Sequence, residues 1–241
     1  MGEGAIWIVG GLDPSSGAGV LRDVATVRAL ARTRPVHVVV TALTNQGDGK
    51  PAVAGPMDAA ALRFQFARAP KPAVIKIGLV PASLVGALVE MLDGVDAPRV
   101  LDPVLGASAG GDLTASPKAL MRLAKGSVVT PNAREYDALV GGADPEGWVE
   151  LQGAVGVLRK GGHDGGSQVT DTLWTRKGAQ VFSRPRGASG DPRGTGCALA
   201  SAIACGLADD ADVGAAVGKG IAWLDAVRGQ AKSVGGQLLL P

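Results

Sequence analysis

The chain has 241 residues, of which 46% are hydrophobic and 19% are charged, and its formal net charge is +2 at pH 7. This composition excludes a disordered chain, which has few apolar residues and a high net charge. The charge excess is too small for electrostatically driven binding to nucleic acid, and an aromatic content of 3% leaves few side chains to stack on bases. We therefore expect a globular protein with no nucleic-acid partner.

No apolar run reaches the roughly 18 residues that a membrane span needs, and the chain does not begin like a signal peptide. The two cysteines, Cys197 and Cys205, fall in one predicted helix, about 12 Å apart along its axis, which is too far for a disulfide. These features predict a cytoplasmic protein from a reducing compartment, with no membrane partner.

In the first half of the chain, short apolar runs alternate with segments of helical periodicity. The apolar runs, which are rich in branched residues, predict strands over 5–10, 36–43, 73–77 and 99–104. Helices are predicted over 17–32, over 58–69 with Asp58 as the cap, over 81–92 with Pro81 as first residue, and from Ser116-Pro117 onward.

The second half continues the same alternation. Strands are predicted over 128–130 and 155–159, a hairpin over 169–175 and 180–184 around Lys177-Gly178, and helices over 133–140, 194–207 and 212–228. The tail over 233–241 is weakly patterned. Repeated strand–helix units predict one α/β domain over 1–241, with a mostly parallel sheet covered by helices on both faces. Ligands of such folds bind beyond the carboxyl ends of the strands.

The segment Asp191-Pro-Arg-Gly-Thr-Gly-Cys197 runs directly into an alanine-rich helix. Glycines at a helix start leave N–H groups pointing outward, and with the helix dipole these form an anion site. Cys197 falls in the first turn, where the same field is expected to lower the pKa of its thiol. The alternative interpretation is a tightly packed helix start with a small buried cysteine.

Four polar residues follow predicted strands. Asn132 and Glu135 share one face of a helix start, where they suit a hydrated Mg²⁺, although the same pair could simply form a capping box. Asp102 ends an apolar strand, which favours metal or phosphate chemistry, with a turn-forming Asp-Pro as the alternative. Lys160 is placed to meet a phosphate, whereas His163, shortly after it, is interpreted as structural.

A Gly/Ser loop over 10–19 lies between the first strand and helix and could wrap a small substrate. Asp23, further into the helix, could face the same site, and a flexible connection is the alternative. Gln46 follows the second strand, and its amide can both donate and accept, which suits the edge of an aminopyrimidine. An exposed loop glutamine is the alternative there.

Seven motifs occur in one order along the chain: GLDPSSGAG, TALTNQ, KIGL, VLDPVL, TPNxxE, KGGH and GTGC. From about Ile6 to Leu224 the chain resembles the hydroxymethylpyrimidine/phosphomethylpyrimidine kinases of thiamine biosynthesis, within the ribokinase-like superfamily. The resemblance implies a three-layer α/β/α sandwich and ATP-dependent phosphorylation of 4-amino-5-hydroxymethyl-2-methylpyrimidine to its phosphate and on to its diphosphate. A pyridoxal or other vitamin kinase, and a non-catalytic ligand-binding protein of this fold, are the alternatives.

The resemblance also implies roles for the residues of phosphoryl transfer. The anion hole for the transferred group would be made by Gly194, Thr195 and Gly196, with Cys197 as the general base. The ligands that organise Mg²⁺ around ATP would be Asp102, Asn132 and Glu135. The nucleotide would be contacted by Lys160 and Thr195.

For the small-molecule substrate, the resemblance implies that Gln46 and Thr44 read the aminopyrimidine. Its site would be lined by Gly11, Asp23 and Leu79. The chain departs from the family at Arg193, where a histidine is common, and after DPVL, where the run GASAGG carries no cation. The segment over 141–154 looks short beside the family and is expected to lack part of a helix. The resemblance also implies a homodimer.

Overall fold

The computed structural model describes residues 4–47, 50–106, 116–162, 164–187, 190, 192–234 and 236–241. In chain order its elements are β1 (Ala5–Leu12), α1 (Gly19–Leu30), β2 (Val36–Gly47), β3 (Lys50–Pro56), α2 (Ala59–Phe66), β4 (Pro72–Ile77), α3 (Ala82–Leu92), β5 (Arg99–Leu101), α4 (Pro117–Leu120), a 3-10 turn (Met121–Leu123), β6 (Ser127–Val129), α5 (Ala133–Leu139), α6 (Pro145–Leu151), β7 (Gly156–Arg159), β8 (Gln168–Thr175), β9 (Gly178–Pro185), α7 (Thr195–Ala208), α8 (Val213–Arg228), β10 (Lys232–Val234) and β11 (Gln237–Leu239).

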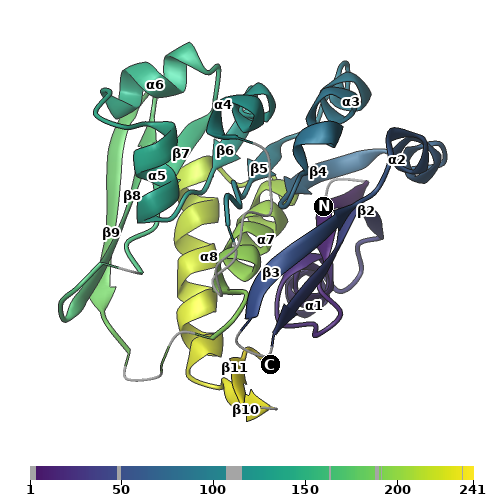
Figure 1. Cartoon of the computed structure of the whole chain (residues 1–241). Coiled ribbons are helices and arrows are strands. Elements are labelled where there is room, and N and C mark those ends of the chain that lie inside the picture. The colour runs from purple at the N-terminus through teal and green to yellow at the C-terminus, as the bar shows by residue number, and fades with distance from the viewer. Residues whose placement is uncertain are drawn as a thin grey trace.

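One large sheet organises the molecule (Figure 1), with the strand order β3-β2-β1-β4-β5-β6-β7-β8-β9. The strands from β2 to β7 in this order run parallel, and β3, β8 and β9 pair antiparallel at the two edges. Two helical layers cover the sheet, so the expected three-layer α/β/α fold with a mostly parallel sheet is confirmed. Among the described residues, no helix combines the length and apolar character needed to cross a bilayer.

The period of two along the buried strands sends alternate side chains into two cores. In β1, Trp7 and Val9 pack on the face covered by α2 to α6, whereas Ile6 and Ile8 pack against α1, α7 and α8. The same alternation in β4 turns Lys76 toward the face of α1 and α7, because Ile75 and Ile77 occupy the other one. A charged residue therefore enters an otherwise apolar layer.

The sequence did not predict three of the elements that the structure contains. The edge strand β3 has the sequence KPAVAGP, whose glycine and prolines carry no strand signal, and its pairing with β2 holds it in place. The segment over 141–154 contains a helix, α6, capped by Asp144. The weakly patterned tail forms the hairpin β10–β11, which is stabilised by contacts distant in the sequence.

Some predicted boundaries are also wrong. Helix α1 begins at Gly19 rather than at residue 17, because the Asp13 carboxylate accepts the Ala18 N–H and holds the preceding loop outside the helix. Pro81 caps α3 instead of starting it, and its ψ of 148° is extended. Strand β5 ends at Leu101, so that Asp102 already belongs to the loop beyond the strand.

Candidate active site

The carboxyl ends of five neighbouring parallel strands, β1, β4, β5, β6 and β7, meet at one edge of the sheet. Backbone bonds join each strand end to the next: Gly78 N–H to Val9 O at 2.8 Å, Asp102 N–H to Ile77 O at 2.8 Å, Thr130 N–H to Leu101 O at 2.9 Å and Lys160 N–H to Pro131 O at 2.9 Å. The loops that follow these strands are thereby fixed side by side, as the strand order requires.

A cavity of about 240 Å³ opens over this edge. It is lined by twelve of the residues that the sequence singles out: Gly11, Asp23, Thr44, Leu79, Asp102, Asn132, Glu135, Lys160, Gly194, Thr195, Gly196 and Cys197. Gln46 belongs to β2, but its side chain lies outside the described part of the structure, as do His163 and most of the run GASAGG. The fold thus gathers residues that are up to 186 positions apart from Gly11 to Cys197.

Asp102 and Lys160 form an ion pair in the wall of the cavity, with Nζ 3.0 Å from Oδ1. Their side chains are 5% and 12% exposed. Burial alone would raise the pKa of the Asp102 carboxyl, but the Lys160 and Lys76 ammonium groups outweigh burial and hold it below its ordinary value. The pKa of Lys160 is raised, because the attraction of Asp102 and Glu135 exceeds the effect of burial. Both partners therefore carry their charges at neutral pH.

Asn132 and Glu135 form the capping box at the start of α5. The Asn132 Oδ1 accepts the Glu135 N–H at 3.0 Å, and the Glu135 Oε2 accepts the Asn132 N–H at 2.8 Å. Glu135 nevertheless lines the cavity, and burial raises the pKa of its carboxyl against the opposing effect of Lys160. Glu135 can therefore cap α5 and still offer its carboxyl group to a metal ion in the cavity.

These groups suit a magnesium ion that takes few ligands from the protein and the rest from water and phosphate. Asp102 is paired with Lys160, and the Glu135 carboxyl lies near the same ammonium group, so two carboxyl groups face this part of the cavity. Within the described ranges, no three or more His, Cys, Asp or Glu side chains gather as a metal-binding cluster. Mg²⁺ commonly takes one or two carboxylates and completes its octahedron with water and phosphate oxygens. The donor set present fits that mode.

The N-terminus of α7 faces the cavity with its backbone. Gly194 precedes the helix with a φ of 77°, and among the described residues no side chain caps this helix. The first helical bond is donated by Ala198 N–H to Gly194 O at 2.8 Å. The N–H groups of Thr195, Gly196 and Cys197 consequently have no helical acceptor, and the residues line the cavity. This arrangement suits an anion.

The expected lowering of the Cys197 pKa is wrong. Burial raises the pKa of this thiol to about 12, with a further increase from Asp23 and Asp102. The Lys76 ammonium and the Gly19 N–H, which donates to the sulfur, act in the opposite direction but do not compensate. The loss of solvation at the base of the cavity exceeds the field of the helix N-terminus. Cys197 therefore rests as a neutral thiol at pH 7.

Alkylation of Cys197 by iodoacetamide should be slow at pH 7 and should accelerate by about tenfold per pH unit up to pH 10, because the thiolate is the nucleophile. Mass spectrometry of the peptide that contains Cys197 measures the rate, and Cys197→Ser identifies its signal. A plateau of the rate between pH 7 and 8 would contradict the raised pKa.

Sequence reasoning assigned no role to Lys76, which forms a fully buried ion pair. Its Nζ lies 2.7 Å from Asp23 Oδ2, the two side chains are 1% and 0% exposed, and Ser201 Oγ donates to Asp23 Oδ1 at 2.8 Å. The ammonium lines the cavity, and its pKa is raised because Asp23 and the neighbouring acidic groups outweigh burial. The available signal was a lysine inside the apolar run over 73–77.

The cavity extends away from Cys197 toward β8, β9 and α8. This part is lined by Gly162, Asp171, Arg184, Leu224 and Arg228. The Arg184 guanidinium bridges two carboxylates, with Nη1 2.8 Å from Asp171 Oδ2 and Nε 2.6 Å from Asp225 Oδ2. Apart from Gly162 of the KGGH motif, these residues were not singled out from the sequence, since their relation to the cavity depends on the antiparallel edge of the sheet.

Comparisons with known proteins agree with this geometry. The family model described as phosphomethylpyrimidine kinase matches residues 13–239. The hydroxymethylpyrimidine/phosphomethylpyrimidine kinase of Streptomyces coelicolor is 34% identical over 87% of this chain and 82% of its own, and that of Salmonella typhimurium is 32% identical over 94% and 91%. The ADP complex of Bacillus subtilis pyridoxal kinase superposes with a TM-score of 0.86 at 19% identity, over 99% of this chain and 97% of that chain, which shows a shared ribokinase-like fold.

Proposed function

The chain belongs to the phosphomethylpyrimidine kinase family, and we propose that it transfers the γ-phosphoryl group of ATP to the hydroxymethyl group of 4-amino-5-hydroxymethyl-2-methylpyrimidine, in thiamine biosynthesis. One observation carries the proposal. A helix start whose first N–H groups have no helical acceptor, a buried lysine and two carboxyl groups line one cavity. Phosphoryl transfer depends on positioning and charge stabilisation, which these groups supply.

The nucleotide phosphates are proposed to lie between Lys160 and the start of α7. Asp102, Glu135 and Asn132 would hold Mg²⁺, which when bound neutralises phosphate charge. Lys160 is paired with Asp102 before the nucleotide arrives and would turn its ammonium toward a phosphate oxygen. Before ligands bind, the ion pair therefore keeps Asp102 and Lys160 charged, with each neutralising the other. Mg²⁺ and a phosphate would then take over these two partners.

At the other end of the cavity, the hydroxymethyl oxygen would attack the γ-phosphorus in line. The new O–P bond forms as the bond to the β-phosphate oxygen breaks, and ADP leaves. The N–H groups of Gly194, Thr195 and Gly196 stabilise charge on the transferred group. In a loose transition state the attacking hydroxyl keeps its proton until late. The neutral thiol of Cys197 cannot take this proton, so Cys197 is proposed to act as the base only from its minor thiolate form, which the Lys76 ammonium and the Gly19 N–H favour against the effect of burial.

The pyrimidine is proposed to bind between the first loop and the ends of β2 and β4. Gly11, Thr44 and Leu79 line this part of the cavity, and Asp23 lies at its base beside Lys76. Thr41 Oγ1 donates to Leu79 O at 2.6 Å, and Thr44 Oγ1 donates to Leu12 O at 3.1 Å, so the surrounding backbone is fixed. Gln46 is proposed to read the aminopyrimidine edge.

The test is ADP release from Mg·ATP with hydroxymethylpyrimidine, its monophosphate, pyridoxal and ribose supplied separately. We expect turnover with hydroxymethylpyrimidine, and turnover with the monophosphate would extend the activity to the diphosphate. Turnover with pyridoxal alone would replace the proposal by a pyridoxal kinase, and absence of turnover with all four would favour a ligand-binding protein.

The enzyme is further proposed to be a cytoplasmic homodimer. Cell fractionation tests its location, and analytical ultracentrifugation measures its oligomeric state.

A further inference from the structure

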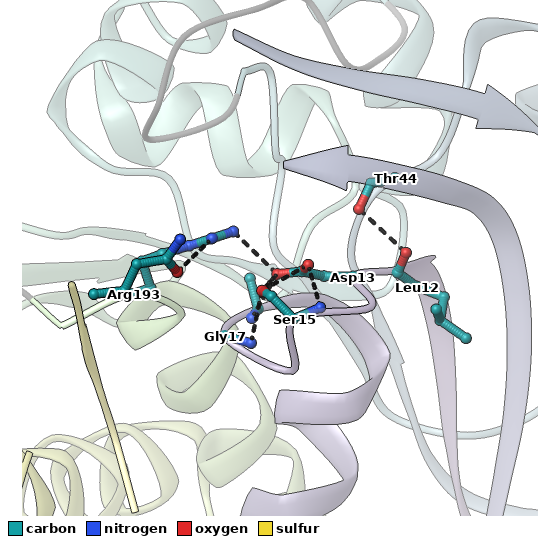
Figure 2. A network of polar contacts seen from close by, with 8 residues as sticks. Leu12, Asp13, Ser15, Gly17, Thr44 and Arg193 are labelled. Atoms are coloured by element: carbon teal, nitrogen blue, oxygen red, sulfur yellow. Dashed lines mark hydrogen bonds and ion pairs between the residues drawn. The ribbon is translucent and has the colours of Figure 1, made fainter. Parts of the chain in front are cut away.

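Arg193, the residue directly before Gly194, joins three segments that are far apart in the sequence (Figure 2). Its Nη2 lies 3.0 Å from Asp13 Oδ2 in the loop after β1, and its Nη1 donates to Gln237 Oε1 at 2.9 Å in β11. Its backbone N–H donates to Leu238 O at 2.9 Å. The side chain is 19% exposed, so these are sheltered, charge-assisted contacts. We refer to Asp13, Arg193 and Gln237 as the clasp.

Asp13 organises the loop that leads into α1. Its side chain is fully buried, and its carboxylate accepts the Ser15 N–H at 3.0 Å, the Ser15 hydroxyl at 2.8 Å and the Ala18 N–H at 3.1 Å. The loop then reaches Gly19, whose N–H donates to the Cys197 sulfur. The position of Asp13 therefore determines where this N–H points.

The two loops that the clasp connects also touch directly. A Cβ atom on Gly194 would collide with the Gly17 carbonyl oxygen and would lie 3.1 Å from Arg22 Cγ. Because the Gly17 carbonyl oxygen is a backbone atom, rotation of a side chain cannot relieve this contact. A shift of the loop over 13–19 must consequently move the start of α7.

The end of the described chain is tied to the same place from the other side. Arg22 in α1 donates from Nη1 to Pro241 O at 2.7 Å and from Nη2 to Leu240 O at 2.9 Å. Arg22 is 7% exposed, and burial lowers the pKa of its guanidinium. Without these two carbonyl acceptors, this buried cation would lose the contacts that offset its desolvation. Arg193 thus holds β11, and Arg22 in α1 holds the two residues that follow this strand.

We propose that Arg193 is a positioning residue for phosphoryl transfer, which uses Asp13 and Gln237 to hold the loop over 13–19 against the start of α7. The clasp keeps the Gly19 N–H on the Cys197 sulfur and keeps the N–H groups of α7 aimed at the transferred phosphoryl group. A guanidinium can serve both partners because its donors form a rigid fork. This inference rests on the proposed function for its catalytic consequence, but the order of the loop can be measured without turnover.

The experiment compares Arg193→Met, Arg193→Lys and Gln237→Ala in the full chain. The matched control is Arg176→Met, because Arg176 is exposed in the turn between β8 and β9. For Arg193→Met we expect kcat to fall by about 10-fold to 100-fold, since small misplacement of reacting groups has effects of this size. The KM for ATP should change less than kcat and stay within about threefold, because Lys160 and the proposed metal ligands belong to other loops, which the contacts of the clasp do not include. Arg193→Lys should recover most of kcat through its pairing with Asp13, and Gln237→Ala should be intermediate.

Hydrogen exchange of the peptide over 13–22, followed by mass spectrometry, gives the independent readout. Exchange should accelerate at least about tenfold in Arg193→Met and should match wild type in Arg176→Met. Unchanged exchange, unchanged kcat, or a Lys variant no better than Met would overturn the inference. If Arg193→Met does not fold, Gln237→Ala decides by the same two measurements. Absence of turnover in the wild type would refute the proposed function alone, and exchange would still decide whether the clasp orders the loop.

Discussion

Gly194→Ala should reduce kcat by about 100-fold to 1,000-fold, the range measured for removal of one backbone or amide donor to a developing anion. Alanine at this position meets two separate obstacles. The φ of 77° belongs to the left-handed region, and the added methyl group would collide with the Gly17 carbonyl oxygen. The first turn of α7 must therefore move, and the N–H groups of Thr195 and Gly196 with it. Steady-state kinetics with Mg·ATP measures the loss.

Gly94→Ala is the matched control for this substitution. Gly94 follows α3 with a φ of 72°, but no atom lies within 4 Å of a Cβ built there. It should lose about 1 kcal/mol of stability from the left-handed conformation and keep its kcat. Comparison of the two variants separates the cost of the backbone conformation from displacement of the anion site. Equal kcat values in both variants would show that the start of α7 does not bind the transferred group.

Lys76→Met is expected to lower the free energy of unfolding by about 3–5 kcal/mol, because removing one partner leaves the other charge buried and uncompensated. The remaining carboxylate of Asp23 is fully buried, and only Ser201 donates to it among the described side chains. Burial raises the pKa of Asp23, so in the variant this carboxyl can take up a proton as the pH falls. The destabilisation should therefore be larger at pH 8 than at pH 5, as urea unfolding at the two pH values measures.

Two further variants decide whether the buried charge is the cause. Asp23→Asn combined with Lys76→Met should recover much of the lost stability, since no ion is then left without a partner. Arg63→Met removes an exposed partner of Glu90, with side chains 60% and 72% exposed, and should cost under about 1 kcal/mol. A double variant as unstable as Lys76→Met would show that the methionine fails to pack, rather than that Asp23 is unpaired.

Much of the candidate site follows from local sequence. Alternation of apolar runs and helical periodicity predicts parallel strand–helix units, and in this architecture the residues after the strands lie at one edge. Asp102, Asn132 and Lys160 are singled out on that ground, and all three line the cavity. The capping box of Asn132 and Glu135 is equally local, since its two hydrogen bonds span three residues.

Hydrophobic periodicity does not reveal β3 or the hairpin β10–β11, which form through their contacts with other segments. Strand β3 is held by its pairing with the neighbouring strand β2, β11 accepts the Arg193 N–H, and the residues after β11 accept from Arg22. Neither segment has a run of branched or aromatic residues. Both are held by hydrogen bonds to other segments, and patterns within a few residues do not show those bonds.

The sequence by itself therefore determines the fold class and the chemical types present at the strand ends, because both depend on patterns within a few residues. The tertiary structure alone decides the charge states. Lys76 is paired with Asp23, 53 positions away, and Lys160 with Asp102, 58 positions away. Burial raises the pKa of Cys197 to about 12 where the helix start alone suggested a lower value. Solvation and Coulomb energies depend on all groups brought close in space, and the order of residues along the chain does not contain those distances.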